Sequence, residues 1–262
     1  MQDIINLIQK LSYRHSTSKV FSDFVEISAL AFSNAVDKSQ FDEREKRYMD
    51  IVGQYKKEEV YEFPKLLGML VNHLEETPRD VLGEAFHALE LHNEHKGQFF
   101  TPYPMCRMMA KMVINEGYED IISKYGFITL SEPACGTGAM VIATAHELKD
   151  RNINYQQVTH TTATDIDPLC VHAAYVQFSL LNIPAVVVHG DTLRMQEWSH
   201  WYTPAHVLGN WSHKLKFKQR YKSMVSIIED INTQTQEITT PSKDTIEPIQ
   251  RPFGNGTQLT IF

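Results

Sequence analysis

The sequence predicts an α/β protein with a helical N-terminal region, a doubly wound parallel sheet and a flexible tail. Three observations support this prediction. Apolar side chains recur at helical spacing through the first 95 residues, and from residue 125 short β-branched runs alternate with helical patterns. Beyond residue 230 the chain is polar, with few apolar groups. We therefore expect a helical region over 1–95, a sheet domain over 96–230 and a tail over 231–262.

The N-terminal region contains several amphipathic stripes. The first of them is formed by Ile4, Ile5, Leu7, Ile8 and Leu11. Further along, Thr77 and Asp80 frame a Pro-Arg pair in a pattern typical of a helix start before Val81. His87, His92 and His95 lie nearby, but no other potential ligands cluster with them, so we expect no metal site. The simplest interpretation is a stabilising bundle without chemistry of its own.

The second half of the chain alternates between strand and helix. The expected strands cover 127–132, 158–164, 185–189 and 205–209, and the expected helices cover 139–150 and 168–181. This period is typical of parallel sheets, which bind ligands at the carboxyl ends of their strands.

A glycine-rich turn follows the first expected strand, and it reads Glu132-Pro133-Ala134-Cys135-Gly136-Thr137-Gly138. A Cβ at either glycine would hold a ligand away from the backbone or disfavour a positive φ. The turn lacks the third glycine of a dinucleotide fingerprint and the lysine of a phosphate loop. Taken alone, it is compatible with nucleotide binding or with a plain strand-to-helix turn.

Carboxylates follow the next two expected strands. Asp165 is placed to accept hydrogen bonds from ribose hydroxyls, and Asp191 is placed to accept one from an adenine amino group. A solvated helix cap is the alternative for Asp191. Asp167 precedes Pro168 and is expected to cap the helix that begins there.

Together with Gly97-Gln98-Phe99-Phe100-Thr101-Pro102 upstream, these motifs resemble the N6-adenine DNA methyltransferases. The likeness is to the modification subunits of type I restriction systems in particular, and it extends over about 81–210. It implies a Rossmann-like class I methyltransferase sheet, here shortened, and S-adenosylmethionine as cofactor. The cofactor-binding residues that it implies are Phe100, Thr101, Glu132, Ala134, Cys135, Gly136, Gly138, Asp165, Ile166 and Asp191. Phe99 and Phe100 are equally compatible with an anchoring role in the core.

The resemblance also implies a catalytic loop after a fourth strand, where the family carries Asn-Pro-Pro-aromatic. This chain has Asn210, Trp211, Ser212 and His213 at that place. The asparagine is retained and both prolines are missing. Because prolines stiffen such a loop, catalysis is less strongly indicated than cofactor binding.

Basic residues follow the catalytic loop, namely Lys214, Lys216, Lys218, Arg220 and Lys222. They are placed to contact DNA phosphates, and the solvated face of a helix is an equal alternative. No target-recognition domain is visible, so a separate specificity subunit is an expected partner alongside double-stranded DNA.

The chain ends in a pentapeptide that resembles the bacterial sliding-clamp binding motif. Its proposed anchors are Gln258, Leu259, Ile261 and Phe262. A short motif of this kind binds by folding onto a groove. The alternative is a tail strand that pairs with the open edge of the protein's own sheet.

Composition limits the remaining functional classes. A net charge of −7 and a pI near 5.9 argue against a protein that coats DNA broadly. Three cysteines without ligand spacing, the lack of a long apolar run and the lack of a signal peptide favour a cytoplasmic protein.

The leading hypothesis is a DNA adenine-N6 methyltransferase that uses S-adenosylmethionine and is recruited by the clamp. The alternative is a catalytically impaired, cofactor-binding protein that acts as a clamp-bound adaptor or regulator. Methylation of a protein amide or an RNA base is a third, less favoured class.

Overall fold

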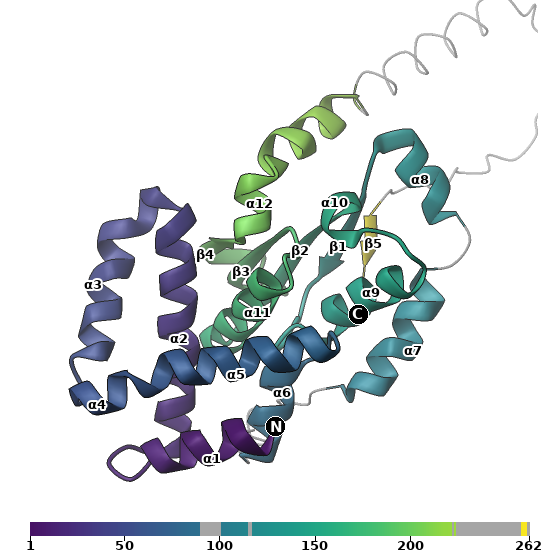
Figure 1. Ribbon diagram of the computed structural model, residues 1–262. Coiled ribbons are helices and arrows are strands. Elements are labelled where there is room, and N and C mark those ends of the chain that lie inside the picture. The colour runs from purple at the N-terminus through teal and green to yellow at the C-terminus, as the bar shows by residue number, and fades with distance from the viewer. Residues whose placement is uncertain (90–100, 115–116, 222, 224–257, 261–262) are drawn as a thin grey trace, which may run out of the picture.

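The computed structural model describes residues 1–89, 101–114, 117–221, 223 and 258–260. Helices form its N-terminal part, and a twisted sheet with helices packed on it forms the rest (Figure 1). The mixed α/β class predicted from the sequence is confirmed.

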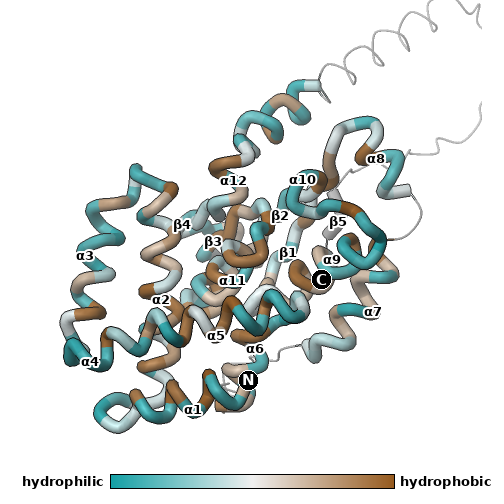
Figure 2. The backbone as a smooth tube through the Cα atoms, viewed as in Figure 1, coloured by the Kyte–Doolittle hydropathy of each residue, from teal (hydrophilic) through white to brown (hydrophobic). Residues whose placement is uncertain are grey.

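The N-terminal helices are α1 (Gln2–Leu11), α2 (Thr17–Val36), α3 (Phe41–Val52), α4 (Lys57–Val60), α5 (Glu62–Glu76) and α6 (Val81–Ala88), with a short 3-10 turn over Lys38–Gln40. The Ser16 side chain caps α2 by accepting from the Lys19 amide, and the Asp80 carboxylate caps α6. Figure 2 shows hydrophilic and hydrophobic residues alternating along α1 and α5. Helices of this kind bury one face and expose the other, as their sequence pattern predicts.

Three parallel strands form the centre of the sheet, namely β1 (Ile128–Glu132), β2 (Thr159–Asp165) and β3 (Ala185–Asp191). Helices α9 (Ala139–Asp150) and α11 (Pro168–Leu180) connect them. The remaining helices near the sheet are α7 (Tyr103–Val113), α8 (Tyr118–Tyr125) and α10 (Tyr155–Val158). The strand order β4-β3-β2-β1-β5 places the carboxyl ends of β1, β2 and β3 side by side at one edge.

The outer strands differ from the prediction. Strand β4 (Gln196–Tyr202) is antiparallel to β3 and was not expected. The predicted strand over 205–209 is wrong, because that segment is helix α12 (Pro204–Leu208). Thr203 caps this helix by accepting from the His206 amide, and Pro204 occupies its first turn, where a missing N–H costs nothing.

Strand β5 (Gln258–Thr260) pairs in parallel with β1 at the other edge of the sheet. This pairing matches the alternative interpretation of the terminal peptide, a strand on the protein's own sheet. Ile261 and Phe262 lie outside the described residues.

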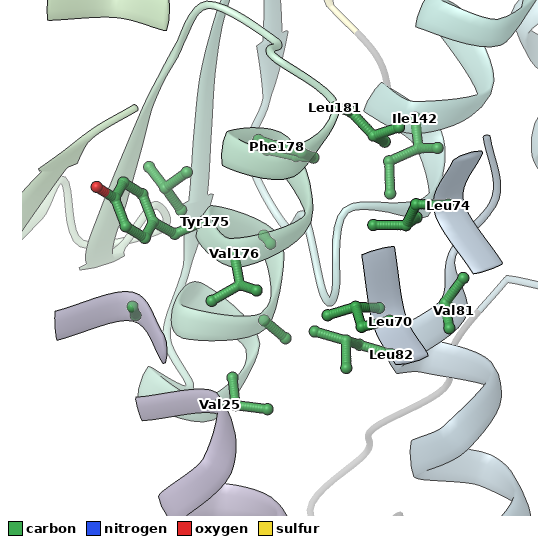
Figure 3. Packing of buried hydrophobic residues seen from close by; sticks show 14 of the residues in the cluster. Val25, Leu70, Leu74, Val81, Leu82, Ile142, Tyr175, Val176, Phe178 and Leu181 are labelled. Atoms are coloured by element: carbon green, nitrogen blue, oxygen red, sulfur yellow. The ribbon is translucent and has the colours of Figure 1, made fainter. Parts of the chain in front are cut away.

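One hydrophobic core joins the N-terminal helices to the sheet domain. Figure 3 shows Val25 of α2, Leu70 of α5 and Leu82 of α6 close to Val176 of α11. All four side chains are fully buried. The helical region therefore packs on the layer that supports the glycine turn, because α11 lies between the two.

The second face of the sheet is covered at its amino end by α12 and by the helical segment 211–221. Trp211 is fully buried there, and its ring centroid lies 5.1 Å from that of Phe127 and 5.4 Å from that of His160. Farther along β2, Thr162 is exposed. Among the described residues, no helix is both long and apolar enough to span a membrane.

The burial of Trp211 gives a direct test of this packing. We expect Trp211→Ala to lower the free energy of unfolding by about 3–5 kcal/mol, because it leaves a large cavity. Phe217→Ala in the same helical segment, where the ring is 66% exposed, should change it by about 0.5 kcal/mol or less. Chemical denaturation measures both values. Equal effects of the two substitutions would contradict the burial of the indole.

Candidate functional site

The glycine turn lies at the carboxyl end of β1 and leads directly into α9. Gly136 and Gly138 have φ angles of 53° and 100°, a region that disfavours other residues. A Cβ on Gly138 would come within 2.5 Å of the Phe178 ring. The Cys135 amide donates to the Thr164 carbonyl over 2.8 Å, which fixes the turn against the end of β2. The turn is thus held close to its neighbours: Gly138 is buried against Phe178, and Gly136 is partly exposed.

Asp165 connects the end of β2 to this turn. One carboxylate oxygen accepts from the Gly136 amide at 2.8 Å, and the other accepts from the Asp167 amide at 2.9 Å. Burial raises the pKa of Asp165, and these two hydrogen bonds oppose that rise by stabilising the charged form. A carboxylate offers about four acceptor sites, so positions remain for the hydroxyls of a ligand.

Glu132 lies beneath the turn and is 1% exposed. Its Oε1 accepts from the Ala134 amide at 3.2 Å, whereas its Oε2 is buried without a hydrogen-bond partner among the described residues. Burial, reinforced by the charge of Asp165, raises the pKa of Glu132 to about 7. A buried acceptor without a partner is costly, and a donor from a bound ligand would satisfy it.

Asp191 ends β3 beside the same turn. Its carboxylate accepts from the Arg194 amide at 3.0 Å, as a cap does, which was the alternative interpretation of this residue. The Thr192 hydroxyl donates to the Pro133 carbonyl at 2.7 Å, so the end of β3 is tied to the turn. Ile166 is 60% exposed at this edge. The structure therefore brings the turn, Asp165, Ile166 and Asp191 to one edge of the sheet.

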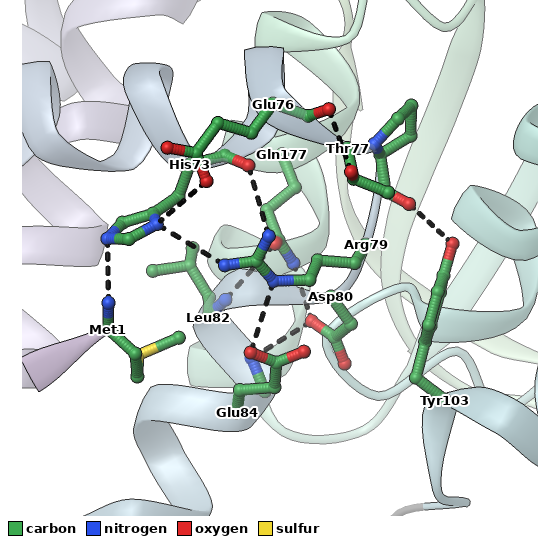
Figure 4. A network of polar contacts seen from close by, with 12 residues as sticks. Met1, His73, Glu76, Thr77, Arg79, Asp80, Leu82, Glu84, Tyr103 and Gln177 are labelled. Carbon is green, nitrogen blue, oxygen red and sulfur yellow. Dashed lines mark hydrogen bonds and ion pairs between the residues drawn. The ribbon is translucent and has the colours of Figure 1, made fainter.

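A buried polar network around Asp80 supports the turn from the helical side, and Figure 4 shows Asp80 beside Gln177. The Asp80 carboxylate accepts from the Thr137 hydroxyl at 2.5 Å, from the Gln177 side-chain amide at 2.8 Å and from the Gly83 amide at 2.9 Å. Gln177 also donates to the Thr137 carbonyl at 2.8 Å. The sequence identified Asp80 as a cap but contained no local signal for its contact with Thr137, 57 residues away.

Thr101 lines a cavity of about 570 Å³ between α6 and the start of α7. Asp80 and Gly83 line the same cavity, and Asp80 also contacts the glycine turn. The Tyr103 hydroxyl donates to the Pro78 carbonyl at 2.7 Å and so holds α7 to the helical region. Phe100 lies outside the described residues.

The structure does not bring Asn210, Trp211, Ser212 and His213 to this edge. Asn210 has a φ of 52° and forms the turn between α12 and segment 211–221. Trp211 packs on the residues that begin β1 and β2, so this segment lies at the amino ends of the strands. The five residues of β1 span on the order of 15 Å, which separates the amino edge from the carboxyl edge. A strand over 205–209 would have carried the chain to the carboxyl edge and placed Asn210 there. Because this segment is helix α12, Asn210 stays at the amino edge.

Buried histidines accompany this segment. His206 contacts His160 at 2.8 Å through its Nδ1 and Ser212 Oγ at 2.9 Å through its Nε2. Burial lowers the pKa of His160 to about 3 and that of His206 to about 4, so both rings are neutral at physiological pH. Ser212 and Trp211 thus have structural partners at the amino edge.

The basic residues of segment 211–221 have different environments. Lys214, Lys216 and Arg220 are exposed. Lys218 is buried, and its ammonium group donates to the Phe127 carbonyl at 3.1 Å. Lys222 lies outside the described residues.

The raised pKa of Glu132 makes a prediction about stability. A carboxyl group whose pKa is near 4.5 in the unfolded chain and about 7 in the folded one stabilises the fold below pH 4.5 and loses that contribution as the pH rises to about 7. Glu132→Gln does not ionise, so it should gain about 1–3 kcal/mol of unfolding free energy relative to the wild type between pH 4.5 and pH 8. Denaturation of both proteins across this range measures the difference, and a constant difference would refute the shift.

Comparisons with known proteins identify the family of the chain. The family model described as N-6 DNA Methylase matches residues 77–243, which is more than half of the chain. A structure from Listeria monocytogenes, assigned as a class I S-adenosylmethionine-dependent methyltransferase, is 17% identical with a TM-score of 0.40, covering 73% of this chain and 53% of its own. This chain therefore spans about half the length of that protein.

A second structure, assigned as a modification subunit of a type I restriction enzyme from Vibrio vulnificus YJ016, is 18% identical with a TM-score of 0.30. The match covers 56% of this chain and 28% of that one. A search of curated proteins gave no significant match. On the strength of the family model, the chain belongs to the N-6 DNA methylase family.

Proposed function

We propose that the chain binds S-adenosylmethionine at the carboxyl edge of its sheet and transfers the methyl group to N6 of adenine in DNA. One observation carries the binding part of this proposal. The buried Glu132 accepts from the Ala134 amide of the glycine turn through one oxygen, and its other oxygen has no partner among the described residues. The family membership supports the nature of the reaction.

Each residue at this edge has a role that follows from its position. Asp165 is suited to accept from ribose hydroxyls, and Asp191 is suited to accept from an adenine amino group, because both carboxylates end neighbouring strands. Ile166 offers an exposed apolar surface for the adenine ring. Ala134, Cys135, Gly136 and Gly138 supply backbone, and Glu132 supplies a buried acceptor. Thr101 borders the cavity on the far side of Asp80.

The cofactor carries an activated methyl group, so the protein contributes mainly by positioning. Gly136 is fixed by the Asp165 carboxylate and Thr137 by the Asp80 carboxylate, so the turn is constrained on both sides. Preorganisation of this kind lowers the cost of orienting a ligand.

A second candidate function is a cofactor-binding adaptor that transfers no methyl group. The position of Asn210 at the amino edge favours it, because the family's asparagine loop acts beside the cofactor. In either case, double-stranded DNA and a separate specificity subunit are the proposed partners. The net charge of −7 opposes binding to DNA phosphates. A partner that binds both DNA and this chain would raise the local concentration of DNA around the chain.

Two matched variants test the cofactor pocket that both candidates share. Asp165→Asn should weaken binding of S-adenosylmethionine by about 1–3 kcal/mol, because one carboxylate acceptor is lost. Asn210→Gly keeps the positive φ while removing the amide, so it should leave cofactor affinity unchanged. Calorimetry measures both affinities. Unchanged affinity in Asp165→Asn would refute the proposed pocket.

Transfer of a labelled methyl group to DNA, measured on the same proteins, decides between enzyme and adaptor. The proposed enzyme methylates adenine, and Asn210→Gly is expected to retain this activity because Asn210 lies at the amino edge of the sheet. Cofactor binding without transfer to any DNA, with the family's specificity subunit present, would favour the adaptor.

The terminal peptide is proposed to recruit the protein to a bacterial sliding clamp through Gln258, Leu259, Ile261 and Phe262. Because Gln258–Thr260 pairs with β1, clamp binding requires this strand to leave the sheet. Deletion of 258–262 should abolish clamp binding and preserve cofactor affinity, which pull-down and calorimetry measure. A truncated protein that still binds the clamp would contradict recruitment through this peptide.

A further inference from the structure

A groove rich in aromatic and lysine side chains lies between segment 211–221 and the end of α8. It has a volume of about 420 Å³, within the range of ligand sites. We call it the aromatic–lysine groove, and its lining includes Lys124, Tyr125, Phe127, Lys214, Phe217, Lys218 and Tyr221. Phe127 directly precedes β1, so the groove opens at the amino edge, away from the glycine turn.

Two of its aromatic rings are presented to solvent. Phe217 is 66% exposed and Tyr221 is 44% exposed. The Tyr221 ring meets the Tyr125 ring edge to face at 6.3 Å, which orients it along the groove. Rings that project from one helix at positions i and i+4 lie on the same face, so they form a short platform.

The charge of the groove is positive although the chain is acidic. Segment 211–221 contains lysines and an arginine but no acidic residue. Below the exposed rings, the Lys218 ammonium lies 4.4 Å from the Phe127 ring centroid and 5.1 Å from that of Tyr125. Lys124 lies 5.2 Å from the Tyr125 ring, and Lys214 lies 4.3 Å from the Trp211 ring. These contacts fix cations along both the floor and the wall of the groove.

We infer that the aromatic–lysine groove binds unpaired nucleotides of a DNA strand. Exposed rings offer stacking surfaces to bases of any sequence, and the lysines neutralise the adjoining phosphates. A purely apolar ligand would make no use of the positive charge of the groove, and a purely anionic peptide would leave the rings uncovered. This site is separate from the cofactor edge, so it does not depend on the proposed methyl transfer.

The test measures fluorescence anisotropy of a labelled twelve-residue oligothymidine with the full chain. Phe217→Ala and Tyr221→Ala should each weaken binding by about five- to a hundredfold, because each removes a stacking surface. Lys214→Gln should weaken binding and reduce the slope of log affinity against log salt by about 0.7. Tyr61→Ala, which removes a 61% exposed tyrosine from the N-terminal helices, is the matched control and should change nothing.

An oligomer of abasic sites with the same phosphates separates stacking from charge. The proposal requires that it bind more weakly than oligothymidine and that Phe217→Ala leave its affinity unchanged. Equal affinity for both oligomers, unchanged binding in both aromatic variants, or equally strong competition by polyglutamate would overturn it. Because both aromatic side chains are exposed, their removal is expected to preserve the fold, which thermal melting checks.

Discussion

The arrangement of the proposed cofactor edge depends on the hydrogen bond from the Thr137 hydroxyl to the buried carboxylate of Asp80. A buried charge is tolerated only when donors surround it, and here Thr137, Gln177 and the Gly83 amide provide them. The contact leaves no space at Gly83, where a Cβ would lie 2.1 Å from Asp80 Oδ2 and 2.6 Å from Thr137 Oγ1. The helical region therefore supports the glycine turn through Asp80, in addition to stabilising the fold.

The two edges of the sheet have different chemistry. At the carboxyl edge, Glu132 and Asp165 accept from amides of the glycine turn, and Glu132 keeps an acceptor oxygen without a partner among the described residues, which suits a ligand that donates hydrogen bonds. At the amino edge, Trp211, neutral histidines and lysines form a tightly packed aromatic layer with a basic outer surface. Because all three central strands are parallel, residues that follow strands gather at one edge and residues that precede them gather at the other.

Features set by local sequence could be predicted. The strand before Glu132, the turn at Gly136 and Gly138, and the carboxylate of Asp165 each follow from a few adjacent residues. The helical character of the N-terminal region follows from its apolar spacing in the same way. In these cases local preference and tertiary packing favour the same structure.

One misassigned element could have been predicted, whereas contacts between distant residues could not. The segment 205–209 has an apolar centre that resembles a strand, but the Thr203 cap and Pro204 favour a helix, and these signals were available in the sequence. By contrast, nothing adjacent to Asp80 or Gln177 indicates that they meet Thr137. The placement of Asn210 depended on the misassigned strand, so the error in one element moved a whole candidate loop to the wrong edge.

Hydrogen exchange of the full chain, with and without S-adenosylmethionine, tests the central claim most directly. We expect the cofactor to slow exchange over 132–138, 165–167 and 189–194, because those amides lie at the carboxyl edge. We expect no change over 204–221, at the amino edge. Protection confined to 204–221, or none at saturating cofactor, would contradict the placement of the cofactor site.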